Sequence, residues 1–288
     1  DSKILLSVWK DKISCQESFR ALSQRLASDL KIEKLLQTAS MDEILDDDLF
    51  DLVDKKIISE LSQQIVSESA SSDKVARIIK RRENKYWYDD FKPFYQSLED
   101  ASMMISMVRK MTPVLFSSFE EGVEQYGREL FKVDLQYRRF LFHYRQTGQN
   151  KVLDPLATKI GKVYTNDWLL SSSNEWQKII DKTDRWNASS NYFQQKFFQV
   201  HVRPFTVKNQ RLFVIISDAL RFESGWEYCR KIQTENRYEA EMGYMYTGLP
   251  SYTQLGMAAL LPGQEMSIAG EGQVMVNGLS SAGIAGRT

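Results

Sequence analysis

The chain has 288 residues, of which 42% are hydrophobic and 12% aromatic, so it can bury a sizeable core and is long enough for one large or two ordinary domains. Its 38 basic and 38 acidic residues cancel, which excludes a protein whose overall field attracts nucleic acid or an anionic membrane. No apolar run approaches the roughly 18 residues of a membrane span, and Cys15 and Cys229 have neither zinc-ribbon nor disulfide-framework spacing. We therefore expect a soluble protein of the reducing cytoplasm with no membrane partner.

Glycine placement predicts two domains. Only four of the 14 glycines precede residue 224, and the other ten lie in the last 64 positions. Glycine is costly inside helices and useful in tight turns, so this asymmetry predicts a helical domain at residues 1–204 and a mixed domain at residues 205–288, with strands only after about residue 205. Because the chain begins at Asp1 and shows no signal-peptide pattern, we also expect that it is a piece of a longer protein.

The first of these domains shows apolar residues at helical spacing. Two stripes run through residues 19–30 and 49–65, and a helix pair is expected from about Phe94 to Tyr144, bent at Pro113, where the proline ring disfavours an unbroken helix. One wide apolar face in this pair should pack against another helix; it comprises Leu130, Val133, Tyr137, Phe140 and Leu141.

Two charged stretches have alternative interpretations. The basic residues between Arg77 and Lys85 precede the aromatic residues 86–88, a pattern that suits either nucleic-acid binding or, more commonly, a solvated helix face beside an aromatic core edge. The acidic residues between Asp42 and Asp51 lack the glycine and terminal glutamate of an EF-hand, so we interpret them as solvated helix starts.

The last domain alternates strand and helix patterns. The apolar run Arg211–Ser217 has the length and β-branched content of a central parallel strand, and a helix is expected at about Phe222–Gln233. A second strand at Glu239–Thr247 and a short helix at Thr253–Leu261 complete the order. This order is typical of an α/β layered fold.

Two residues of this domain are candidates for chemistry. Asp218 directly follows the predicted strand, where open α/β folds place their ligands, so it is a candidate metal ligand; an N-cap of the next helix explains it equally well. Thr253 begins the short helix, where a hydroxyl can meet a phosphate, but capping is the commoner local role. A threonine nucleophile needs a base or a metal, and neither His143 nor His201 is a plausible base, which leaves a metal.

The residues around these two positions resemble a known family. The motifs at Val214–Glu223 and Leu249–Pro262 are similar to those of the PglZ family, the phosphatase-like component of BREX phage-defence systems, and the resemblance covers about the last 80 residues. It implies the beginning of an alkaline-phosphatase-like α/β sandwich domain, with Asp218 as a metal ligand and Thr253 as the nucleophile and a second metal ligand. The chain has no histidine after His201, whereas the family completes its site with Asp and His residues in the C-terminal half of the domain.

The resemblance therefore implies a metal-dependent phosphohydrolase, a phosphodiesterase or phosphatase of antiviral defence, that uses divalent metal, with two zinc ions in the complete domain. Its implied partners are other BREX proteins including a methyltransferase and a phosphoester or nucleotide substrate, with nucleic acid as a further candidate. We expect the chain to stop within the catalytic domain, to bind metal weakly and to be inactive by itself. The alternative is a non-catalytic scaffold or nucleotide-sensing module of the defence complex, docked through its helices.

Overall fold

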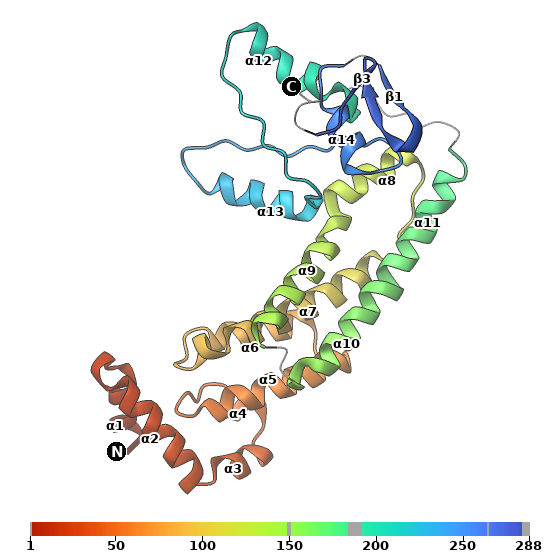
Figure 1. The fold of residues 1–288 in the computed structure, drawn as a ribbon. Helices are drawn as coiled ribbons and strands as arrows, with labels where there is room; N and C mark the ends of the chain where they lie inside the picture. Colours follow the sequence, from red (N-terminus) through yellow and green to blue (C-terminus); the bar gives the residue numbers. More distant parts are fainter. Residues whose placement is uncertain (1, 149–150, 184–191, 264, 284–288) are drawn as a thin grey trace. The chain divides into compact units, whose positions relative to one another are not determined.

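A computed structural model of the protein describes residues 2–148, 151–183, 192–263 and 265–283, and Figure 1 shows the order of its elements. The chain forms two compact units. The first comprises the residues up to 115 together with 132–177, and the second comprises residues 116–131 together with 178–288. The functional division into residues 1–204 and 205–288 stays a prediction.

The described residues of the first unit form helices joined by short turns and loops, with no strand. Its α-helices are α1 (Ser2–Asp11), α2 (Gln16–Asp29), α3 (Ile32–Thr38), α4 (Met41–Ile44), α5 (Asp51–Val66), α6 (Ser72–Arg82), α7 (Tyr88–Met111), α9 (Phe131–Gln146), α10 (Asp154–Lys162) and α11 (Ser171–Ile180), the last of which runs into the second unit. Short 3-10 turns at Ile13–Cys15 and Lys151–Leu153 and a π-helix at Val163–Leu170 connect them.

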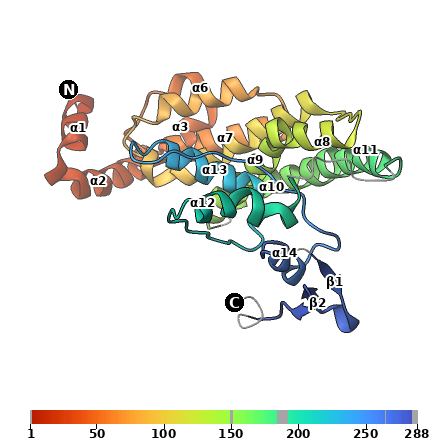
Figure 2. The same ribbon diagram turned by 90° about the horizontal axis from the view of Figure 1, so that it is seen from above.

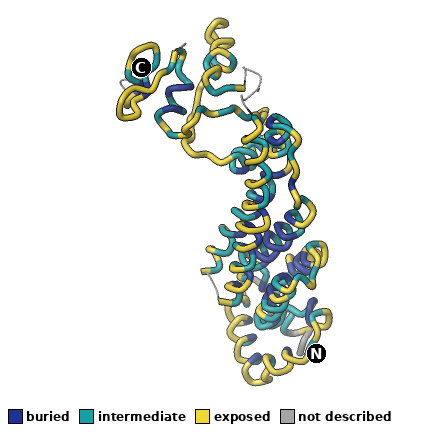
Figure 3. Tube along the Cα trace, turned by 90° about the vertical axis from the view of Figure 1, so that its right-hand side faces the viewer, coloured by how far each residue is buried: buried dark blue, intermediate teal, exposed yellow. Residues whose placement is uncertain are grey.

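The predicted apolar stripes form the core of this unit. Val53, Ile57, Leu61 and Ile65 of α5 are all buried, and Figure 3 shows the buried stretches along these helices. The face of α9 is also used as predicted, since the Tyr137 ring stacks on Tyr164 with centroids 3.7 Å apart. The stripe on α2 is only partly buried: Phe19 is covered, but Leu30 at its end is exposed.

A proline interrupts the long helix pair where the sequence predicts it. Helix α7 ends at Met111, two residues before Pro113, and α8 (Phe119–Gln125) begins after a short connection. The break follows from proline's missing N–H and from the extended backbone that it favours in the residue before it. Ser118 starts α8 by accepting a hydrogen bond from the backbone N–H of Glu121 at 3.1 Å.

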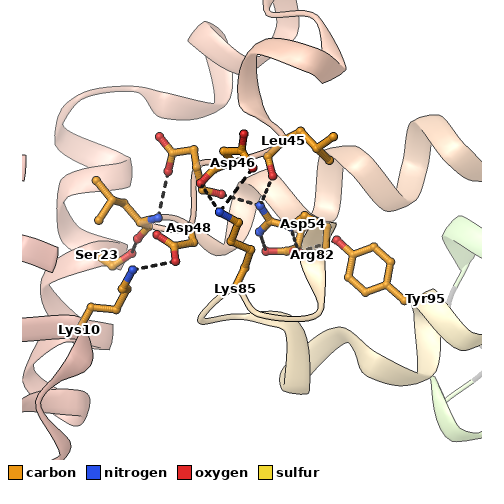
Figure 4. A network of polar contacts seen from close by, with 11 residues as sticks. Lys10, Ser23, Leu45, Asp46, Asp48, Asp54, Arg82, Lys85 and Tyr95 are labelled. Atoms are coloured by element: carbon orange, nitrogen blue, oxygen red, sulfur yellow. Dashed lines mark hydrogen bonds and ion pairs between the residues drawn. The ribbon is translucent and has the colours of Figure 1, made fainter. Parts of the chain in front are cut away.

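A buried ion pair lies between α5, α6 and α7 of the first unit (Figure 4). Arg82 donates to both carboxylate oxygens of Asp54 at 3.0 and 2.7 Å, and to the carbonyl oxygens of Leu45 and Asp47 at 2.8 and 2.7 Å. The Tyr95 hydroxyl donates to the same carboxylate. Because Arg82, Asp54 and Tyr95 are fully buried, these contacts replace the water that each polar group has lost. They tie the loop after α4 to the core.

The two charged stretches of the sequence become part of this framework. Arg81 and Lys85 pair with Asp46, and Lys80 pairs with Glu83, while Trp87 is buried beside Phe19. Of the acidic residues, Asp42 and Glu43 lie in the first turn of α4 and Asp51 begins α5, while Asp46 meets these cations and Asp48 pairs with Lys10. These contacts agree with the interpretation as helix faces and helix starts.

The second unit combines short helices with a small sheet. Its elements are α8, a π-helix at Tyr126–Leu130, a 3-10 turn at Gln194–Lys196, a π-helix at Phe198–Val202, α12 (Arg203–Val207), α13 (Phe222–Gln233), α14 (Thr253–Ala259), β1 (Met266–Ile268), a 3-10 turn at Gly270–Gly272, β2 (Val274–Val276) and β3 (Leu279–Ser280). Helix α13 has the bounds that the sequence predicts, and α14 ends two residues early.

The sheet is antiparallel in the order β1-β2-β3, with Ser267 opposite Met275 and Val276 opposite Leu279. Asn277 and Gly278 join β2 and β3, and both have positive φ, 49° and 79°, as a two-residue hairpin turn requires. Helix α14 packs on this sheet (Figure 2). Leu255 and Ala258 of the helix and Val274 of β2 form a small buried cluster.

Two predicted strands are absent from the described part of the second unit. Residues 211–217 have no strand pairing, and Phe213 and Ile215 are 78% and 90% exposed. Of the second predicted strand, residues 239–247, only Tyr246 forms an isolated parallel bridge, to Phe193. A segment forms a strand only when a neighbouring segment forms backbone hydrogen bonds with it. Apolar composition alone does not provide that neighbour. The expectation of a central parallel sheet is therefore wrong for the described residues, although strands do appear only after residue 205.

Candidate functional site

Asp218 lies in a turn between the apolar residues 211–217 and α13. The backbone N–H of Leu220 donates to the carbonyl of Ser217 at 3.4 Å, and Ala219 has a φ of 55°. Helix α13 begins only at Phe222, with Arg221 at its N-cap position and no side-chain cap. The alternative of Asp218 as the N-cap of this helix is therefore not what the structure shows. Its carboxylate is exposed and points to another partner.

That partner is Thr253. Its hydroxyl donates a hydrogen bond to Oδ2 of Asp218 at 3.0 Å, across 35 residues of sequence. Thr253 is the first residue of α14, whose N-cap position is Tyr252, and its hydroxyl is engaged by the carboxylate instead of capping helix N–H groups. The two residues singled out in the sequence thus come together at an exposed point of the second unit, and the capping alternative for Thr253 is not supported.

The residues after Asp218 form a second, weaker contact. Arg221 Nη1 lies 3.7 Å from Oε1 of Glu223, and the Arg221 side chain is mostly exposed while Glu223 is buried. The pairing that the sequence allows across the start of α13 is thus present. It also leaves the guanidinium at the surface, a few residues from Asp218.

The donor set fits one part of a metal site. A carboxylate and a hydroxyl oxygen 3.0 Å apart are ligands that divalent cations accept. Among the described residues, however, no group of three or more His, Cys, Asp or Glu side chains is close enough to hold an ion. His143 belongs to the first unit, where Nδ1 lies 2.7 Å from Asp100 Oδ2, and His201 lies in the π-helix before α12 beside Phe197.

A set of aromatic contacts, which the sequence patterns do not predict, holds the segments on either side of this pair. They come from residues 116–131, which the sequence assigns to the helical domain. Phe131 contacts Phe222 and Trp226 of α13, with centroids 5.2 and 5.5 Å apart, and Phe119 contacts Tyr246 at 5.6 Å. The one signal in the sequence is glycine: Gly122 and Gly127 lie within an otherwise helical pattern, where glycine is costly and often marks a close approach.

Comparison with known proteins supports the resemblance drawn from the motifs. Residues 197–288 match the family model described as the BREX system PglZ alkaline phosphatase-like domain. No solved structure matches the chain significantly. No helix among the described residues is both long and apolar enough to cross a membrane.

Two curated proteins are similar over most of the chain. The alkaline phosphatase-like protein PglZ of Bacillus cereus (strain H3081.97) is 26% identical over 262 residues, which are 90% of this chain and 31% of that protein. The alkaline phosphatase-like protein BrxZ of Escherichia coli O9:H4 (strain HS) is 30% identical over 295 aligned residues, 97% of this chain and 34% of that protein. The chain thus spans about a third of the length of these relatives. With the motifs around Asp218 and Thr253, these matches confirm the resemblance to the PglZ family, and residues 197–288 are the part that matches its alkaline phosphatase-like domain.

Proposed function

We propose that the complete protein hydrolyses a phosphomonoester or phosphodiester, with Thr253 as the nucleophile and Asp218 as a ligand of a divalent ion. The observation that carries the proposal is the 3.0 Å hydrogen bond between these two side chains. Sequence motifs alone select both residues, and the fold brings them into contact across 35 residues of chain. A threonine that meets an acidic side chain at an exposed turn is open to a substrate and has a neighbour that can take part in its chemistry.

The chain's own residues then have separate tasks. The oxygen of Thr253 forms a bond to phosphorus, the bond from phosphorus to the leaving oxygen breaks, and a phosphothreonine results. The hydrogen bond to Asp218 orients the Thr253 hydroxyl, and the proton that this hydroxyl loses is finally taken up by the leaving oxygen. Water then attacks the phosphothreonine, which releases phosphate or a phosphomonoester and restores the hydroxyl.

A divalent ion held by Asp218 and facing Thr253 would supply Lewis-acid stabilisation of the phosphoryl oxygens and a lower pKa of the hydroxyl. We propose zinc, with two ions in the complete domain, as the family resemblance implies. Two oxygens make an incomplete ligand set, and the relatives are about three times as long as this chain, so the other ligands would come from protein outside these residues. The chain by itself should be inactive.

The setting proposed for this activity is a BREX defence system, with other BREX components, including a methyltransferase, as partners. The domain description and the names of the relatives support the BREX setting. The methyltransferase partner rests on the family resemblance alone. The alternative of a purely structural module finds less support, since the wide apolar face of α9 that favoured docking is used within the first unit: Val133 and Phe140 are fully buried there.

The test uses the full-length protein, a generic aryl phosphodiester and an aryl phosphomonoester. We expect Thr253→Ala and Asp218→Ala to lower turnover to background while the circular dichroism spectrum stays unchanged, because both residues are exposed and remove little packing. Asp218→Ala should also lower the zinc content measured by mass spectrometry. Ser251→Ala is the matched control, since it removes an exposed hydroxyl two residues from Thr253 and should leave turnover unchanged. Wild-type turnover in Thr253→Ala would exclude this threonine as the nucleophile.

A further inference from the structure

Residues 116–131, here called the support segment, belong to the second unit although residues 132–177 separate them from the rest of it. The segment consists of α8 and the π-helix Tyr126–Leu130, followed by Phe131. Its aromatic side chains contact two other parts of the unit. The first is α13, where Tyr126 and Phe131 contact Phe222 with centroids 5.9 and 5.2 Å apart; the second is residues 244–246, where Phe119 meets Tyr246.

Gly127 lies where these two parts meet. A Cβ atom at this position would be 3.6 Å from Cζ of Phe222 and 3.9 Å from Cδ1 of Tyr244, so the glycine backbone faces both rings. Phe222 is the first residue of α13, four residues after Asp218, and Tyr244 precedes Thr253 by nine residues. A single turn of π-helix therefore contacts one ring on the Asp218 side of the site and one ring on the Thr253 side. π-Helical turns are rare in proteins, and those that occur often lie at functional sites.

The pair itself has little packing of its own. Asp218 and Thr253 are both exposed, and the contact recorded between them is one hydrogen bond. Their spacing must then depend on how the segments that carry them are held. Those segments lie close together at Gly225, where an added Cβ atom would be 3.5 Å from Cε of Met242. Both segments also contact the support segment.

We infer that the support segment positions the Asp218–Thr253 pair, with Gly127 as the positioning residue that sets the distance between its two sides. The inference rests on the proposed function only for its kinetic consequence. Enlarging residue 127 pushes Phe222 and Tyr244 away from the π-helix and apart from each other, which separates the hydroxyl from the carboxylate. A misplacement of about 1 Å in a reacting group can cost about 10²-fold in rate.

The kinetic test compares glycine variants of the full-length protein. We expect Gly127→Leu to lower kcat on the aryl phosphodiester by about 10²-fold with KM nearly unchanged, because the substrate-binding surface is retained while the reacting pair is displaced. Gly127→Ala should keep most of kcat, since its methyl group only reaches ordinary contact distance from both rings. Gly161→Leu is the matched control: the same substitution in a helix of the first unit, with open space around it, should change nothing.

A compensating change separates positioning from general damage. Removing the Phe222 ring makes room for the larger residue, so Gly127→Leu with Phe222→Ala should recover part of the lost kcat. Phe131→Leu is a milder second perturbation, which weakens the contacts to α13 without adding volume, and should lower kcat less than Gly127→Leu. A Gly127→Leu protein that folds and keeps wild-type kcat would overturn the inference, as would one in which KM alone changes.

A second measurement needs no activity. In the full-length protein carrying Asp218→Cys and Thr253→Cys, diamide should oxidise the two thiols to a disulfide rapidly, because the parent side chains are in contact. Adding Gly127→Leu should slow this cross-link at least about tenfold, and adding Gly161→Leu should not. Equal cross-linking rates in all backgrounds would refute the positioning role. If instead Thr253→Ala keeps wild-type turnover, the proposed function fails while this measurement still decides whether Gly127 sets the spacing.

Discussion

Replacing Arg82 by methionine measures how much the buried ion pair stabilises the first unit. The substitution keeps an apolar stem but removes the donors to Asp54, to the carbonyl of Leu45 and to that of Asp47. The carboxylate of Asp54 then stays fully buried with the Tyr95 hydroxyl as its remaining donor in the network of Figure 4. Burial already raises the pKa of Asp54, and the guanidinium opposes that rise, so the variant raises it further.

The expected loss is large for one substitution. Breaking a buried pair by removing one partner costs about 3–5 kcal/mol, and two carbonyl groups also lose a charged donor, although such terms do not add fully. We therefore expect Arg82→Met to lower the free energy of unfolding of the first unit by about 4–5 kcal/mol. Arg81→Met is the matched control one residue earlier, and since its ion pair with Asp46 lies in solvent, it should have little effect.

The assay is urea-dependent hydrogen exchange of the α5 and α6 amides, because these helices carry Asp54 and Arg82 and their exchange reports the first unit alone. The double variant Arg82→Met with Asp54→Leu should be more stable than Arg82→Met, since it leaves no unpaired charge in the core. A loss below about 1 kcal/mol in Arg82→Met, an ordinary value for a point substitution, would refute the reasoning. So would a double variant that loses as much as the two single variants together.

Three further outcomes can be measured. Burial raises the pKa of Asp100, the partner of His143, to about 6. Asp100 therefore stabilises the fold most below about pH 4, and this stabilisation is lost as the pH rises through 6. In urea titrations, the difference in unfolding free energy between the wild type and Asp100→Asn should fall by up to about 3 kcal/mol over this window. Ser118→Ala should destabilise α8 by about 1 kcal/mol, seen as faster amide exchange near Glu121, and unchanged exchange would contradict its capping role. Val274→Ala should cost the second unit about 2 kcal/mol, seen as a lower Tm; an unchanged Tm would show that the α14–β2 cluster contributes little.

The helical elements were predictable because each carries its own signal. The stripe in α5 repeats at the helical period, and Pro113 ends the helix before it through its own covalent geometry, so neither needs knowledge of distant residues. The bounds of α13 follow in the same way from local pattern. Of the site, the motifs selected Asp218 and Thr253, and the structure adds the contact between them.

What the sequence could not predict depends on partners far along the chain. The run at residues 211–217 has the composition of a strand, but pairing is a property of two segments, and among the described residues none pairs with it. The contacts of Phe119 and Phe131 with α13 and Tyr246 are likewise invisible in one sequence, because an aromatic residue in a helix looks the same whichever segment it packs against.

The division of the second unit into two segments also sets an order for its synthesis and folding. Phe119 leaves the ribosome well before its partner Tyr246, which lies 127 residues later (246 minus 119). At about 5–20 residues per second, the delay is about 6–25 s. During that time residues 132–177 can complete the first unit, whose segments are all present once residue 177 is made. The nascent chain can thus hold a folded helical unit whose sequence is interrupted by an aromatic segment with partners that have not yet been translated.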